Sequence, residues 1–332
     1  MKTLLESDPD IEVIGLARNG FEAVEMAKEL YPDVVTMDVI MPEKDGFEAL
    51  KEIVENAIAP VIMVSIVTQE NSQEALEALE IGAFDYVPKP EKSTISIMDI
   101  REELISKVKS AAHYSKSTPL LKLLKKKKTE VKSSSGEKAF PGEFYAVAIG
   151  ISTGGPKSIY DVLPLLPENI NAAVFLVQHM PPSFTRGYAE RLDKNCKLKV
   201  VEAEEGIPVK PGMVYVGKGG YHLKLKKLND TEYAIHLSKV PKHMFMPSVD
   251  VMMDAVLEVF GEKTIGVLMT GMGDDGANAM ARIKKAGGYT IAESEETAVV
   301  FGMPQKAIEL GGANVILPSH RIAEEITKIC QL

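Results

Sequence analysis

Two stretches of the chain alternate short apolar runs with amphipathic segments, which predicts two α/β domains built on parallel sheets. In the first stretch, the strands that we expect are 11–17, 33–39, 60–66 and, as a weaker run, 84–87. The helices predicted between and after them are 21–31, about 45–55 and about 97–112. The apolar runs are too short for isolated helices and are bounded by turn residues, so the sheet assignment is favoured.

The second stretch is longer and predicts a larger doubly wound sheet. Its expected strands are 144–151, 172–178, 198–203, 264–270, 289–293 and 314–318. Residues 213–238 alternate differently around Asn229-Asp230 and predict an antiparallel hairpin attached to this sheet.

A change of composition separates the two stretches. Residues 113–142 are rich in lysine and serine and end in Pro-Gly, which is typical of a linker. We therefore expect a first domain at 1–112, a linker at 113–142 and a second domain at 143–332. The run Lys125–Lys128 could bind a membrane or a nucleic acid, but a solvated linker is the favoured interpretation.

Composition narrows the class of protein. The chain has 332 residues, 45% of them hydrophobic, and a net charge of −9, which argues against general nucleic-acid binding. Its two cysteines suggest neither a disulfide framework nor a metal knuckle. No apolar run reaches the roughly 20 residues of a membrane span, and the N-terminus does not resemble a secretory signal. A cytoplasmic protein without membrane insertion is expected.

Polar residues follow three strands of the second domain. Ser152 lies in a Gly-x-Ser-x-Gly turn, which can expose a nucleophile or, equally often, bind phosphate. His179 ends the next strand, where a structural histidine is the plain alternative, and Asp274 and Asp275 follow strand 264–270. Either aspartate could cap a helix, which is the favoured role of Asp274. Since parallel strands place their carboxyl ends at one edge of the sheet, these groups together predict a serine hydrolase.

The second domain resembles the catalytic domain of chemotaxis protein-glutamate methylesterases. The matching segments are 150–156, 178–180, 211–216, 247–250, 270–276 and 300–304. The resemblance implies that Asp275 completes a triad with Ser152 and His179, that Thr153 and Met272 lie near the substrate, and that the Met272 N–H helps to hold the oxyanion. It also implies hydrolysis of glutamate γ-methyl esters on chemoreceptors, with possible deamidation of receptor glutamines, and no cofactor. Met246 stands where the family usually has arginine.

The first domain resembles the receiver domain of response regulators. Asp38, Ser65 and Lys89 each follow a predicted strand and could converge on one phosphoryl group, with Asp38 as its acceptor. Tyr86 matches the aromatic position of the receiver switch. The resemblance implies a chemotaxis histidine kinase as phosphodonor, Mg²⁺ as its cofactor, and a receiver that blocks the esterase until it is phosphorylated.

This receiver departs from its family at the start. The first strand, and the acidic pair that binds Mg²⁺ with Asp38, have no counterpart in the sequence, so the expected metal site is incomplete. We therefore do not expect normal phosphorylation. The simplest hypothesis is a truncated or mis-started gene product, and the rival is a degenerate receiver that serves only as a lid.

Two other functions fit parts of the pattern. A receiver joined to an inactive hydrolase-like domain would be a signalling adaptor, although an intact Ser152, His179 and Asp275 argue against it. A general small-molecule esterase would need the same three residues. The other five histidines, among them His222 and His243, are expected to be structural or surface groups.

Overall fold

The computed structural model describes residues 1–66, 72–89, 97–117, 144–229 and 232–331. The chain divides into two compact units, Met1–Thr129 and Glu130–Leu332. Within the described residues, none of the helices combines the length and apolar character needed to cross a membrane.

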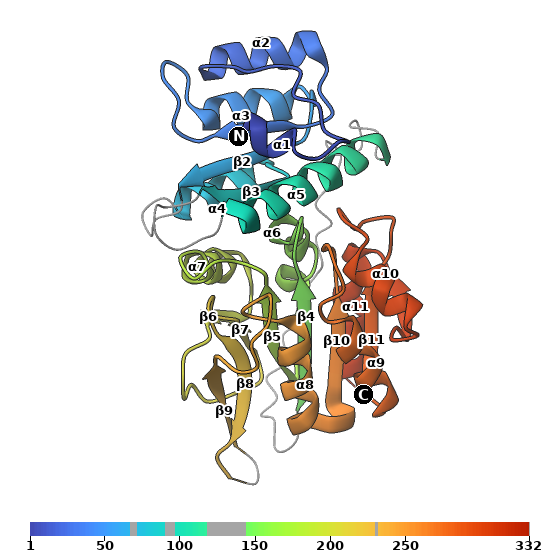
Figure 1. Cartoon of the computed structure of the whole chain (residues 1–332). Coiled ribbons are helices and arrows are strands. Elements are labelled where there is room, and N and C mark those ends of the chain that lie inside the picture. Colours follow the sequence, from blue (N-terminus) through green and yellow to red (C-terminus); the bar gives the residue numbers. More distant parts are fainter. Residues whose placement is uncertain (67–71, 90–96, 118–143, 230–231, 332) are drawn as a thin grey trace. The chain divides into compact units, whose positions relative to one another are not determined.

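The first unit is a small α/β unit (Figure 1). Its parallel sheet has the order β1-β2-β3. The strands are β1 (Val35–Asp38), β2 (Val61–Ile66) and β3 (Asp85–Lys89). The helices are α1 (Lys2–Leu5), α2 (Gly20–Leu30), α3 (Gly46–Glu55), α4 (Ser72–Ile81) and α5 (Ile97–Ser117). The side chains of Asn19 and Asp45 cap α2 and α3 by accepting hydrogen bonds from backbone N–H groups of their first turns.

The strand predicted at 11–17 does not form. Ile14 and Leu16 are 49% and 65% exposed, and this segment has no strand partner within the described residues. In a flavodoxin-like order its neighbour would be the first strand of the fold, which the described part of this unit does not contain. An apolar run becomes a strand only when another strand supplies its hydrogen bonds, so the prediction was wrong here.

The helix predicted at about 97–112 is longer than expected. It continues as α5 to Ser117 and so takes in the first residues of the expected linker. The rest of that linker, residues 118–142 with Lys125–Lys128, lies outside the described residues.

The second unit is built on a seven-stranded sheet in the order β12-β11-β10-β4-β5-β7-β6, and each neighbouring pair is parallel. Its strands are β4 (Tyr145–Ile151), β5 (Ala172–Gln178), β6 (Lys199–Glu202), β7 (Met213–Val216), β10 (Thr264–Leu268), β11 (Tyr289–Glu293) and β12 (Val315–Leu317). The central strands β4, β5 and β10 are almost wholly buried, which explains their continuous apolar sequence.

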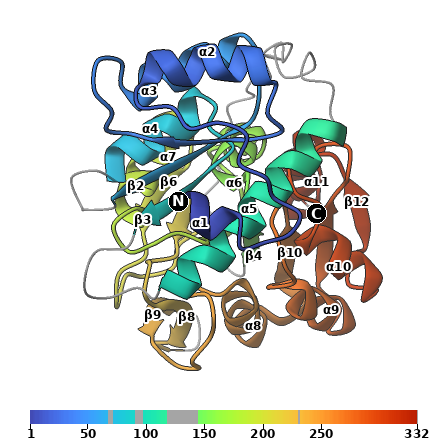
Figure 2. The ribbon, with the colours of Figure 1, turned by 45° about the horizontal axis from the view of Figure 1, so that its top comes forward.

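Helices cover this sheet. They are α6 (Gly155–Ser158), α7 (Thr185–Asn195), α8 (Val249–Phe260), α9 (Ala277–Lys285), α10 (Met303–Glu309) and α11 (Ser319–Cys330), with short 3₁₀ turns η2 (Ile159–Asp161), η3 (Leu163–Leu165) and η4 (Gly261–Lys263). In Figure 2, α8 lies between α9 and the hairpin of β8 (His222–Lys227) and β9 (Tyr233–Ser238), and it packs on both. It also packs on β4 and β5, which brings its first residues to the sheet edge.

The hairpin prediction was only partly right. β8 and β9 pair antiparallel, as expected, but Met213–Val216 forms β7 inside the parallel sheet. The hairpin joins the rest of the unit through an antiparallel bridge between Pro208 and Ala234. Alternating side chains indicate a half-buried strand, but they do not specify which neighbour it pairs with.

Candidate active site

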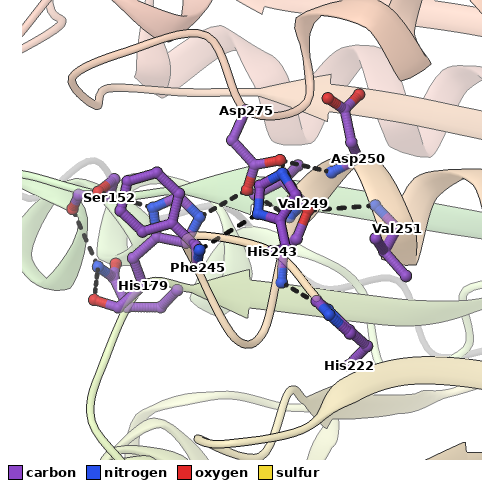
Figure 3. Close-up of polar contacts among 11 residues, drawn as sticks. Ser152, His179, His222, His243, Phe245, Val249, Asp250, Val251 and Asp275 are labelled. Carbon is purple, nitrogen blue, oxygen red and sulfur yellow. Dashed lines mark hydrogen bonds and ion pairs between the residues drawn. The ribbon is translucent and has the colours of Figure 1, made fainter. Parts of the chain in front are cut away.

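Three side chains of the second unit meet at the carboxyl edge of its sheet. Ser152 directly follows β4, His179 directly follows β5, and Asp275 lies in the loop between β10 and α9. Since β4 is flanked by β10 on one side and β5 on the other, the three strand ends are neighbours. Figure 3 shows the imidazole of His179 between the serine and the aspartate.

The imidazole contacts both partners through its ring nitrogens. Its Nδ1 lies 3.1 Å from Ser152 Oγ, and its Nε2 lies 2.8 Å from Asp275 Oδ2. Burial alone would raise the pKa of Asp275, but the hydrogen bond and charge of His179 and nearby backbone N–H groups lower it to about 2. An ionised carboxylate accepts a hydrogen bond from Nε2–H, so the unprotonated Nδ1 faces the serine hydroxyl. This arrangement can take a proton from Ser152 Oγ.

The start of α8 holds the carboxylate of Asp275. The Ser248 hydroxyl donates to Oδ1 at 2.8 Å, the Val249 N–H donates to Oδ2 at 2.7 Å, and the Asp250 N–H donates to Oδ1 at 3.0 Å. A carboxylate at a helix N-terminus is stabilised by the unpaired N–H groups and by the helix dipole. In the sequence, segment 247–250 stood out only because it matches the family, so its contact with Asp275 was not predicted.

The turn that carries the nucleophile is tied to the end of β10. The Ser152 N–H donates to Thr270 O at 2.9 Å, and the Thr270 hydroxyl donates to Thr153 O at 2.9 Å. A Cβ placed on Gly271 would lie 2.8 Å from Ser152 Cβ, so the two loops approach closely. Met272 is the next residue and is half-buried, which places it beside the serine turn.

Gln178 links the nucleophile to the histidine, a role that the sequence did not reveal. Its Nε2 donates to Ser152 O at 3.0 Å and to His179 O at 3.4 Å, and its side chain is buried. The amide therefore bridges the ends of β4 and β5. A glutamine at the end of a buried apolar strand was the only available signal.

A second missed group covers the histidine. The ring of Phe245 lies parallel to the His179 imidazole, with a centroid distance of 4.2 Å and an interplanar angle of 9° (Figure 3). The side chain of His179 is only 8% exposed. Phe245 belongs to a loop without regular secondary structure, where hydrophobic patterning carries no information on contacts.

Asp274 does not cap a helix through its side chain, contrary to expectation. The N-cap of α9 is Gly276, without a side-chain cap, and Asp274 contributes only its carbonyl to the Ala277 N–H at 2.9 Å. Its side chain is exposed, whereas Asp275 is 3% exposed. Of the two neighbouring acids, only Asp275 contacts His179.

In the first unit, two of the predicted receiver residues meet. Lys89 Nζ and the Asp38 carboxylate form an ion pair at the ends of β3 and β1. Ser65 aligns with Pro88 in the β2–β3 register, but its side chain lies outside the described residues. Tyr86 is buried, and burial raises its pKa well above the ordinary value.

The residues around Asp38 do not fit a complete Mg²⁺ site. The described part of the chain contains no group of three histidine, cysteine or acidic side chains that could hold a metal. Mg²⁺ requires near-octahedral oxygen ligands, and Asp38 supplies one carboxylate that is already paired with Lys89.

Comparisons with known proteins find relatives of both units. The sequence model of the CheB methylesterase family matches residues 147–326, and that of the response regulator receiver domain matches residues 1–99. A protein-glutamate methylesterase/protein-glutamine glutaminase of Syntrophomonas wolfei is 51% identical over 99% of this chain and 94% of its own length. A protein of the same name from Pyrococcus abyssi is 43% identical over 100% of this chain and 90% of its own length. The crystal structure of the Thermotoga maritima CheB methylesterase catalytic domain matches with a TM-score of 0.55 and 44% identity, covering 57% of this chain and all of that one.

Proposed function

The chain belongs to the CheB methylesterase family, and from this premise we propose that it hydrolyses glutamate γ-methyl esters with Ser152, His179 and Asp275 as its catalytic triad. The observation that carries the proposal is the position of His179, with Nδ1 at 3.1 Å from the Ser152 hydroxyl and Nε2 at 2.8 Å from Asp275. A hydroxyl, an imidazole and a buried carboxylate in this order are the groups that ester hydrolysis requires.

The reaction follows from the orientation of the imidazole. Ser152 Oγ attacks the ester carbonyl and its proton passes to His179 Nδ1, while Asp275 stabilises the imidazolium through Nε2. The tetrahedral intermediate expels the methoxy group, which takes the proton from Nδ1 and leaves as methanol. Water then gives a proton to Nδ1 and attacks the acyl-enzyme, and Ser152 leaves with that proton. The products are methanol, the free enzyme and a glutamic acid side chain, which ionises by releasing a proton to the solvent. The cycle therefore consumes only water and needs no cofactor.

The charged intermediate needs hydrogen-bond donors near Ser152. Thr153 and Met272 are the candidates, because Thr153 follows the nucleophile and Met272 follows Gly271, which approaches Ser152 closely. Backbone N–H groups in such turns stabilise an oxyanion. The hydrogen bonds of Thr270 with Ser152 and Thr153 support this placement, because they hold the two turns together.

Deamidation of glutamine is the second activity, and the relatives favour it, because they are named protein-glutamine glutaminases as well. The amide would pass through the same tetrahedral intermediate, with ammonia leaving in place of methanol. The same triad therefore serves both reactions, and loss of Ser152 abolishes both.

The substrates are methyl-accepting chemoreceptors, and the reaction reverses receptor methylation during chemotactic adaptation. A receiver that regulates this reaction would take its phosphoryl group from a histidine kinase onto Asp38, but the incomplete metal site argues against normal phosphorylation of this chain. The ion pair between Lys89 and Asp38 supports this assignment, because the lysine is placed to contact a phosphoryl group on that carboxylate. We assign the receiver to 1–112, the linker to 113–142 and the esterase to 143–332.

Methanol release from a methylated chemoreceptor fragment tests the proposal. We expect Ser152→Ala to lower the rate by about a thousandfold or more. Ser294→Ala is the matched control, because the buried Ser294 hydroxyl has no hydrogen-bond partner within the described residues. Full release by Ser152→Ala would refute the assignment. Rapid hydrolysis of a small chromogenic ester with no release from the receptor would instead indicate a general esterase.

A further inference from the structure

Phe245 covers one face of the imidazole that links the triad. We propose that Phe245 is a positioning residue for His179: it fixes the tilt of the ring and favours its protonated form during the reaction. This inference rests on the proposed function and adds a fourth side chain to the three that carry the chemistry. The ring of Phe245 lies 4.2 Å from that of His179, centroid to centroid, at an angle of 9°.

The two hydrogen bonds of His179 leave one rotation of its ring weakly restrained. They reach Nδ1 and Nε2 from opposite sides, at 3.1 and 2.8 Å, and both act within the plane of the ring. Tilting the ring about the line that joins the two nitrogens lengthens neither bond much and turns the Nδ1 lone pair only slightly, so the two bonds alone oppose this tilt weakly. A flat aromatic surface in parallel contact opposes this tilt.

The contact also suits the charge that develops on His179. The face of an aromatic ring carries partial negative charge and attracts a cation placed over it. The imidazole becomes a cation when it takes the proton of Ser152. Phe245 therefore stabilises the charged intermediate more than the resting enzyme, which is the condition for raising kcat.

The loop that carries Phe245 is held by a buried histidine at both ends. His222 Nε2 donates to Pro241 O at 2.8 Å, and its Nδ1 accepts from the Ser248 N–H at 3.2 Å. This pattern requires a neutral ring, and burial lowers the pKa of His222, which keeps it neutral. Within the loop, the Phe245 N–H donates to His243 Nδ1 at 3.2 Å. The position of Phe245 is thus built into the fold.

The test compares Phe245→Leu with Phe245→Tyr in the full chain. Leucine keeps an apolar side chain without an aromatic face, and we expect it to lower kcat for methanol release by between about tenfold and a hundredfold while KM changes less than about twofold. Tyrosine keeps the aromatic face and should retain most of the activity. Phe144→Leu is the matched control, because it removes an aromatic contact with Phe260, away from the triad.

A fluorophosphonate labels a reactive serine without any receptor. The rate of Ser152 labelling therefore tests the role of Phe245 even if the substrate is not a chemoreceptor. We expect Phe245→Leu to slow labelling by a similar factor and Phe144→Leu to leave it unchanged. Equal labelling and equal kcat in Phe245→Leu and the unmodified protein would overturn the proposal. A loss confined to KM would also overturn it, since that result assigns Phe245 to substrate binding alone.

A measurement on the unmodified protein covers the case in which Phe245→Leu does not fold. In the NMR spectrum, the carbon-bound ring protons of His179 should be shifted upfield by the ring current of a face-stacked Phe245. Specific labelling of histidine, with His179→Gln to assign the signals, identifies them. Ordinary chemical shifts for these protons would show that the rings do not stack in solution and would overturn the proposal.

Discussion

The Ser248 hydroxyl donates a hydrogen bond of 2.8 Å to Oδ1 of Asp275, while Asp275 Oδ2 faces His179. The same Ser248 oxygen accepts from the Val251 N–H at 3.3 Å and so caps α8. One side chain therefore both begins the helix and orients the carboxylate that fixes the tautomer of His179.

Ser248→Ala should reduce both stability and activity. Loss of the cap costs about 1 kcal/mol in the free energy of unfolding. Loss of the bond to Asp275 leaves the carboxylate less firmly oriented. We expect this to raise the activation free energy by about 1–1.5 kcal/mol, which lowers kcat about tenfold. Denaturant unfolding and methanol release measure the two effects. Ser248→Thr keeps the hydroxyl and serves as the control, and full activity in Ser248→Ala would contradict the role of this bond.

Gly155→Ala should disturb the link between Ser152 and His179. A Cβ on Gly155 would lie 2.2 Å from Oε1 of Gln178, whose Nε2 donates to the carbonyls of both catalytic residues. We expect a loss of between about tenfold and a hundredfold in kcat, because the bridging amide must move. If this is the cause, Gly155→Ala adds little further loss to Gln178→Ala in a double-mutant cycle. Independent, additive losses would contradict it.

Asp275 should contribute an acid-dependent part of stability. Its pKa is about 2 in the folded protein against an ordinary 3.8, so its contribution is complete above pH 3.8 and is lost as the pH falls towards 2. The shift corresponds to about 2 kcal/mol. Denaturant unfolding measured across this pH range should show a steeper loss in the unmodified protein than in Asp275→Asn, where the group does not titrate. Parallel curves would contradict the lowered pKa.

Phosphorylation of Asp38 should be slow and little affected by Mg²⁺. The described residues offer the metal one carboxylate at this position, and Lys89 already pairs with it. Incubation with a labelled small-molecule phosphodonor, with and without Mg²⁺, measures incorporation, and Asp38→Asn gives the background. Stable, Mg²⁺-dependent incorporation that disappears in Asp38→Asn would contradict this prediction.

Much of the second unit was predictable because its buried strands are continuous apolar runs. The structure has β4, β5, β10 and β11 where the sequence predicted strands. The first three of them are followed by Ser152, His179 and Asp275. The choice of Asp275 over Asp274 came only from the family resemblance, because both acids follow the same strand and the pattern cannot tell which one faces inwards.

Other features depend on contacts between distant segments and left no local signal. The segment 11–17 has the composition of a strand but has no partner within the described residues, and Met213–Val216 joined the parallel sheet instead of the hairpin. The stacking of Phe245 on His179 depends on the path of a loop that is held by His222. Such contacts are tertiary, so propensity and periodicity could not reveal them.

The most direct test of the triad is to map the fluorophosphonate adduct by mass spectrometry in the unmodified protein and in His179→Gln. We predict a single modified serine, Ser152, and a rate of modification that falls by about a thousandfold or more in His179→Gln. Equally fast modification of Ser152 without the imidazole, or an adduct at another serine that abolishes methanol release, would contradict it.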